Sequence, residues 1–215
     1  ILSLLFGDDD LQKTLMIVNT AGHDTDCNSG NVGCIMGIKN GLEGLRNGPD
    51  YLTPIQDRMY CPTANGGETQ TDALTEAYKV INTAKKMNKE ETVEPKNGSR
   101  FHFEMPGSVQ GWRSSFKNNK NISTIVQNTE YESSIGKRAL EIKFDRVAPG
   151  VCSEAVVDTF FPQELYELTG SARERFFQSY NFISCPLLYS GQNIESEIIF
   201  KSNSQKPITV TCFIN

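Results

Sequence analysis

Residues 22–31, with the sequence GHDTDCNSGN, lie between two helical patterns and decide how the first half of the chain folds. Before them, Leu11, Leu15 and Val18 follow the i, i+4, i+7 spacing of one helix face. After them the helical period resumes, which predicts a second helix that starts at position 26 or 28 and continues to about position 41. The stretch 22–31 is therefore expected to form a turn that leads into a helix.

The second predicted helix carries Gly30, Gly33 and Gly37 on one face. A glycine inside a helix costs up to about 1 kcal/mol relative to alanine. Three of them on one face therefore predict close backbone packing against a neighbouring helix. A third helix is predicted to begin at Thr71 and to continue through Ala84, because apolar residues recur there at helical spacing.

The hydrophobic period changes to two in the second half of the chain. A polar segment at 90–100 contains Pro and Gly and predicts a linker. Apolar and polar residues then alternate at 140–144, 194–200 and 208–212, which indicates strands. Asn, Gly and Ser turns separate these strands, and the pattern favours an antiparallel sandwich at 101–215.

The expected fold class is therefore α+β multidomain, with an all-α segment at 1–89 followed by an antiparallel β-sandwich. The chain begins at Ile1, without an initiator Met or the basic region of a signal peptide, and ends at Asn215 inside a predicted strand. We therefore expect a segment of a longer protein, with a truncated sandwich and an incomplete active site.

Composition and charge exclude several classes of function. The chain has 21 Lys and Arg against 26 Asp and Glu, a net charge of -5, so it has no electrostatic reason to bind nucleic acid in bulk. It lacks a run of about 18 apolar residues, so we expect a soluble protein that does not span a membrane. Its six cysteines lack the spacing of a zinc site, and we expect buried thiols rather than a disulfide framework. The compartment stays open.

Asp24 and Asp26 are the candidate metal ligands. Two carboxylates one residue apart at a turn can converge on one point, and Mg²⁺ prefers a few oxygen ligands. The alternative is helix capping, in which one of these carboxylates accepts a hydrogen bond from the N–H groups at the start of the helix.

An ordered set of motifs surrounds the aspartate pair and covers roughly residues 1–88. In chain order these are LFG at 5–7, AGHDTD at 21–26, DRMY at 57–60, GGE at 66–68 and TDA at 71–73. The set resembles the C-terminal part of the ADP-ribosylglycohydrolase family. The resemblance implies an all-α domain with two Mg²⁺ ions in a cleft, which hydrolyses the N- or O-glycosidic bond of ADP-ribose.

By this resemblance, Asp24 and Asp26 match the family's late metal-binding aspartates. Cys27 stands where many members have a Thr or Ser ligand, and a neutral thiol is a poor Mg²⁺ ligand because the ion prefers hard oxygens. The Asn28 amide oxygen is an alternative third ligand, and His23 is either a supporting group or an ordinary surface residue.

The family's early acidic cluster has no counterpart here. We expect the acidic run at 8–10 to form a helix cap and a solvated turn. Half of the metal-binding apparatus is then missing, so the isolated segment is expected to be inactive.

The second half offers a looser resemblance. Residues 101–104, 109–112 and 136–140 resemble the opening strands of jelly-roll domains of the galactose-binding or carbohydrate-binding-module kind. Trp112 is the candidate for stacking on a sugar ring, with the alternative that it packs in the core. Tyr166 and Tyr180 are further candidates if they are exposed.

Two hypotheses of function follow. In the first, the complete protein is an ADP-ribosylglycohydrolase-like hydrolase that depends on Mg²⁺, acts on ADP-ribosylated substrates and carries a sandwich that positions enzyme or substrate. In the second, the protein is a non-catalytic binder of ADP-ribose or of a carbohydrate, an interpretation that Cys27 favours.

Overall fold

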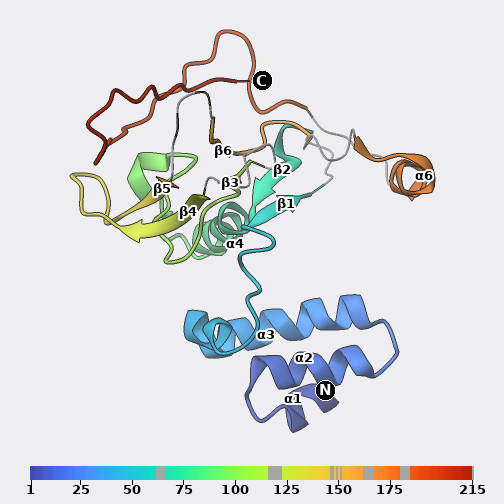
Figure 1. Ribbon diagram of the computed structural model, residues 1–215. Coiled ribbons are helices and arrows are strands. Elements are labelled where there is room, and N and C mark those ends of the chain that lie inside the picture. Colours follow the sequence, from blue (N-terminus) through green and yellow to red (C-terminus); the bar gives the residue numbers. More distant parts are fainter. Residues whose placement is uncertain are drawn as a thin grey trace.

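The protein is a mixed α/β structure. The computed structural model describes residues 1–61, 66–115, 123–145, 148, 150, 152–161, 167–179 and 185–214. Within these ranges the chain forms five α-helices and three two-stranded antiparallel sheets (Figure 1).

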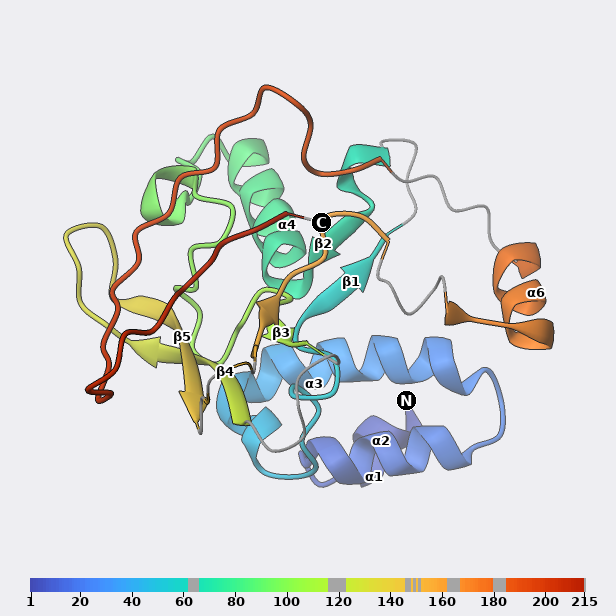
Figure 2. The same cartoon turned by 45° about the horizontal axis from the view of Figure 1, so that its top comes forward.

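The first helices form a small layered unit. Helix α1 (Leu2–Phe6) lies on α2 (Leu11–Thr20), and α2 packs side by side with α3 (Thr25–Arg46) (Figures 1 and 2). The buried apolar side chains between α2 and α3 are Leu11, Val18, Val32 and Met36. The predicted helix at 11–18 is confirmed, and so is the second helix, which continues past a kink at Gly41 to Arg46.

The acidic run before α2 has the structural role expected of it. The Asp10 side chain caps α2 by accepting a hydrogen bond from the Lys13 N–H at 2.6 Å. Asp8 forms an ion pair with Lys13, and Asp9 forms one with Lys39 of α3. The acidic run therefore caps the start of α2 and connects the turn before α2 to α3 through the ion pair of Asp9 with Lys39.

Close packing at the glycine face of α3 is limited to one position. A Cβ atom on Gly33 would lie 3.9 Å from Leu15 Cδ2 of α2, in ordinary contact. In the described part of the chain, nothing lies within 4 Å of a Cβ added to Gly30 or Gly37. The glycine face therefore contacts α2 only at Gly33, and among the described residues Gly30 and Gly37 have no close neighbour.

The expectation of an all-α segment at 1–89 is wrong. Strands β1 (Arg58–Tyr60) and β2 (Gln70–Asp72) pair antiparallel within it, followed by helix α4 (Ala73–Met87). Each strand has only three residues, too few for an alternating pattern to stand out in the sequence. The third helix is confirmed, but it starts after Thr71 because Asp72 caps it by accepting from the Thr75 N–H at 2.9 Å.

The remaining elements are short. A 3-10 turn, η1 (Gly66–Glu68), precedes β2, and a second, η2 (Pro95–Gly98), follows α4. The later elements are β3 (Arg113–Ser114), β4 (Ser123–Glu130), β5 (Arg138–Asp145), β6 (Ala155–Val156) and α6 (Gly170–Ser179). Strand β4 pairs with β5 and β3 pairs with β6, both antiparallel.

The expected β-sandwich, and with it the jelly roll, is also wrong. The strand predicted at 140–144 is confirmed within β5, but in the part of the chain that the structure describes, 194–200 and 208–212 have no regular secondary structure and join no sheet. An alternating pattern determines which side chains share a face, but it does not supply a partner strand. The apolar side chains of this segment accordingly stay exposed, with 62% of Ile198 and 54% of Phe200 accessible.

A buried polar network holds the β part together around Asp158. Arg113 of β3 donates two hydrogen bonds to the Asp158 carboxylate, at 3.1 and 3.0 Å. The Tyr60 hydroxyl donates to the same carboxylate at 3.0 Å, and Arg58 lies 3.9 Å from it. Burial and the Asp158 charge raise the pKa of Tyr60, so its hydroxyl stays protonated and remains a donor.

The cysteines are more exposed than the sequence predicts. None forms a disulfide; Cys61 is half-buried and the other five are exposed, so the prediction of buried thiols is wrong. Among the helices in the described ranges, none combines the length and the apolar character that crossing a membrane requires.

Candidate metal site

The turn between α2 and α3 places Asp24 at the start of α3. Its backbone lies in the left-handed region with φ of 44°, which Asp adopts more readily than most residues. Its carbonyl accepts the first hydrogen bond of the helix, from the Asn28 N–H at 3.0 Å. Its side chain forms no capping hydrogen bond, so capping does not explain the Asp24 carboxylate.

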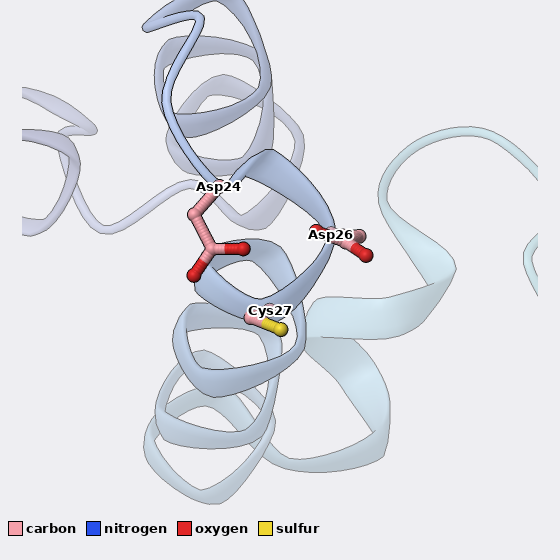
Figure 3. Close-up of side chains that lie close together, drawn as sticks. All are labelled: Asp24, Asp26 and Cys27. Atoms are coloured by element: carbon pink, nitrogen blue, oxygen red, sulfur yellow. The ribbon is translucent and has the colours of Figure 1, made fainter.

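Asp26 and Cys27 follow in the first turn of α3, next to Asp24 (Figure 3). One ligand atom from each of these three side chains lies within 4.8 Å of the other two, and all three residues are exposed. In a tetrahedral zinc site, an oxygen ligand and a sulfur ligand of the same ion lie about 3.6 Å apart. The three atoms are therefore close to one another, but a shared ion requires them to approach further.

Neighbouring polar residues hold this turn in shape. The Asn28 side-chain NH₂ donates to the His23 carbonyl at 3.0 Å, and Ser29 Oγ lies 2.7 Å from Asn19 Oδ1, near the end of α2. Ser29 also donates to the Thr25 carbonyl. Asn28 thus supports the turn through its amide nitrogen, while the His23 side chain is exposed and contributes only its carbonyl.

The electrostatics of the site resist an added negative charge. The charges of Asp24 and Asp26, together with a hydrogen bond to Asp24, raise the pKa of the Cys27 thiol above its ordinary value. The thiol therefore stays protonated at neutral pH while no cation is present. A bound cation reverses this balance because it stabilises the thiolate.

The donor set fits Mg²⁺ only in part. The carboxylates of Asp24 and Asp26 are hard oxygen donors of the kind that Mg²⁺ prefers, and the Cys27 sulfur is not. In the residues that the structure describes, these three form the only group of three or more His, Cys, Asp or Glu side chains close enough to share an ion. A second group, which a two-ion centre requires, is absent from the described ranges.

The structure places Trp112 away from this site, in an aromatic cluster of the β part. The indole ring is half-buried and meets Phe101 edge to face, with 5.8 Å between ring centroids. Its N–H group is buried and has no hydrogen-bond partner among the residues that the structure describes. Tyr166 and Tyr180, the other candidates for sugar stacking, lie outside the described residues.

Two polar arrangements were not predicted from the sequence. The pair Asn19 and Ser29 spans the turn at the metal site, and its only sequence signal is two small polar residues on either side of a predicted turn. The Asp158 network joins residues up to 98 positions apart, so the sequence offers no local signal for it.

Comparisons of the chain with family models, with curated proteins and with solved structures find no match. The resemblance to the ADP-ribosylglycohydrolases is therefore supported by the motifs at 1–88 alone.

Proposed function

We propose that this chain supplies the late divalent-cation site of a hydrolase that cleaves the glycosidic bond of ADP-ribose. One observation carries the proposal: Asp24 and Asp26 bring carboxylate oxygens within 4.8 Å of each other, on a turn where the Asp24 side chain caps nothing. The order of motifs across 1–88, similar to that of the ADP-ribosylglycohydrolases, supports the choice of substrate.

The residues of the site have distinct roles in this proposal. Asp24 and Asp26 hold the cation, while Asn28 and Ser29 fix the turn that presents them. A divalent cation at such a site orients the substrate and stabilises charge that develops in the reaction. The exposure of both carboxylates leaves room for the ribose hydroxyls of ADP-ribose or of an ADP-ribosylated substrate.

Cys27 favours a second candidate function, a non-catalytic protein that binds ADP-ribose or a carbohydrate. A thiol replaces a hard ligand in the group, and a protein that has lost its chemistry needs no Mg²⁺. The two candidates differ in one measurable property, because the hydrolase releases ADP-ribose and the binder retains it unchanged.

The test replaces both aspartates in the protein that contains the complete hydrolase. Loss of a group that only supports a metal ligand lowers activity by about 10–100-fold. Because Asp24 and Asp26 are the ligands themselves in this proposal, Asp24→Asn combined with Asp26→Asn should lower cation-dependent release of ADP-ribose by more than about 100-fold. Asp8→Asn is the matched control, because Asp8 is an exposed acidic residue whose partner is Lys13. Unchanged release in the double variant would refute the proposal, and tight ADP-ribose binding without release would favour the second candidate.

A further inference from the structure

The segment 194–203 lies on the outside of the β part without a partner strand (Figures 1 and 2). Its central apolar side chains are accessible to solvent, by 62% at Ile198, 51% at Ile199 and 54% at Phe200. In the part of the chain that the structure describes, the backbone groups of 194–201 form no hydrogen bond. Unpaired backbone groups beside exposed apolar side chains are a template for pairing with another strand.

The sequence of this segment is complementary to itself in one antiparallel register. When Ile199 of one copy lies opposite Ile199 of another, each Ile198 faces a Phe200 and each Glu197 faces a Lys201. Apolar pairs and pairs of opposite charge at facing positions stabilise antiparallel strands. The register therefore satisfies the five central positions of both copies at once.

The same register also sorts the side chains between the two faces of the strand pair. Because successive side chains of a strand point to opposite faces, Ile198 and Phe200 of both copies gather on one face. Ser196 and Ser202 end this apolar cluster on each side, and they face one another in the register. The cluster is thus bounded by polar residues, as at the rim of a protein interface.

We propose that residues 196–202 bind the same residues of a second copy of this chain, as an antiparallel strand pair with a two-fold axis at Ile199. Such a pairing joins the same surface on both copies and therefore gives a symmetric dimer. The interface shares no residue with the candidate metal site, so the inference goes beyond the proposed function and does not depend on it.

The competing partner for this segment is β5 of its own chain. The pKa of Glu141 in β5 is lowered mainly by a hydrogen bond from the Gln127 side chain, and the charge of Lys201 contributes to the shift. An antiparallel alignment of Lys201 with Glu141 would place Glu197 opposite Asp145, and like charges at facing positions are destabilising. Self-pairing over 196–202 contains no like-charge pair, so the second copy is favoured.

The experiment measures the dissociation constant of the dimer by analytical ultracentrifugation of the 215-residue protein over a series of concentrations. The protein is kept fully reduced, because five of its cysteines are exposed. A strand pair of this size gives a weak and reversible dimer. Glu197→Lys and Lys201→Glu should each raise the dissociation constant by at least about 10-fold, because each creates two like-charge pairs across the axis. The double variant Glu197→Lys, Lys201→Glu should return to within about 3-fold of the parent.

Glu43→Lys is the matched control, because it makes the same change of charge at a side chain that is 78% exposed in another part of the chain. It should leave the dissociation constant unchanged, and circular dichroism verifies that every variant is folded. A dimer that both single variants weaken and the double variant restores supports the inference. A parent that stays monomeric at every concentration, or a dimer that the double variant does not restore, overturns it. Neither result bears on the Asp24–Asp26 site, whose test is the release of ADP-ribose.

Discussion

Asp158→Ala is expected to destabilise the β part by about 3–5 kcal/mol, the usual cost of removing one partner from a buried ion pair. The Arg113 side chain is 6% exposed and that of Asp158 is 16% exposed, so both partners of the pair are largely shielded from solvent. The variant removes the acceptor of two hydrogen bonds from the buried Arg113 guanidinium, and it also removes the acceptor of the Tyr60 hydroxyl.

Urea unfolding followed by tryptophan fluorescence measures this loss. Trp112 is the chain's one tryptophan and precedes Arg113, so its emission reports on the unfolding of this part of the protein. Glu130→Ala is the control, because Glu130 pairs with Arg138 while its own side chain is 88% exposed. A pair with one exposed partner contributes only about 0–1 kcal/mol. Equal losses in the two variants would show that the Asp158 network is no more stabilising than a surface pair.

Met36→Ala is expected to destabilise the helical unit by about 2–5 kcal/mol. Met36 is 2% exposed and belongs to the apolar cluster between α2 and α3. Its truncation leaves a cavity in a small core whose backbone can relax only in part. Because α3 begins with the candidate metal ligands, the stability of this unit also determines whether the site is formed.

Thermal unfolding followed by circular dichroism provides the measurement. Ile38→Ala serves as the control, because Ile38 lies on the same helix two residues later and is 82% exposed. Exposed substitutions of this kind usually change stability by less than about 0.5 kcal/mol. If Ile38→Ala proves as destabilising as Met36→Ala, the apolar cluster between α2 and α3 is not the core of this unit.

Helices α2, α3 and α4 were predictable because each has a local signature, whereas α1 and α6 were not predicted. The periodic apolar residues of α2 and its Asp10 cap lie next to one another in sequence, and α4 has a similar pattern. The sheets were not predictable in the same way. Strand pairing depends on contacts between distant residues, such as Arg113 with Val156, and strands of two or three residues carry no usable period.

The sandwich prediction failed for a related reason. The accessible surface of the protein is 15488 Å², against about 9,900 Å² for a compact chain of this mass. The apolar residues at 194–214 account for part of the difference, because their alternating pattern suits a strand but no strand within the described ranges pairs with them.

The candidate metal site was predictable because Asp24, Asp26 and Cys27 are nearly adjacent in sequence and a turn is enough to bring them together. What the sequence left open was whether the aspartates cap the helix. The backbone of Asp24 decides this for its own side chain, since it enters α3 in the left-handed region and makes no capping hydrogen bond.

The most direct test of the account is whether the aspartate pair binds a divalent cation. Carboxylates bind Mn²⁺ well, and electron paramagnetic resonance distinguishes free from bound Mn²⁺. The concentration of bound Mn²⁺ can therefore be measured for the parent chain and for the double variant Asp24→Asn, Asp26→Asn. Circular dichroism verifies that both are folded. The account predicts a saturable Mn²⁺ site in the parent chain that the double variant lacks. The same saturable binding in both proteins, or none in the parent, would contradict it.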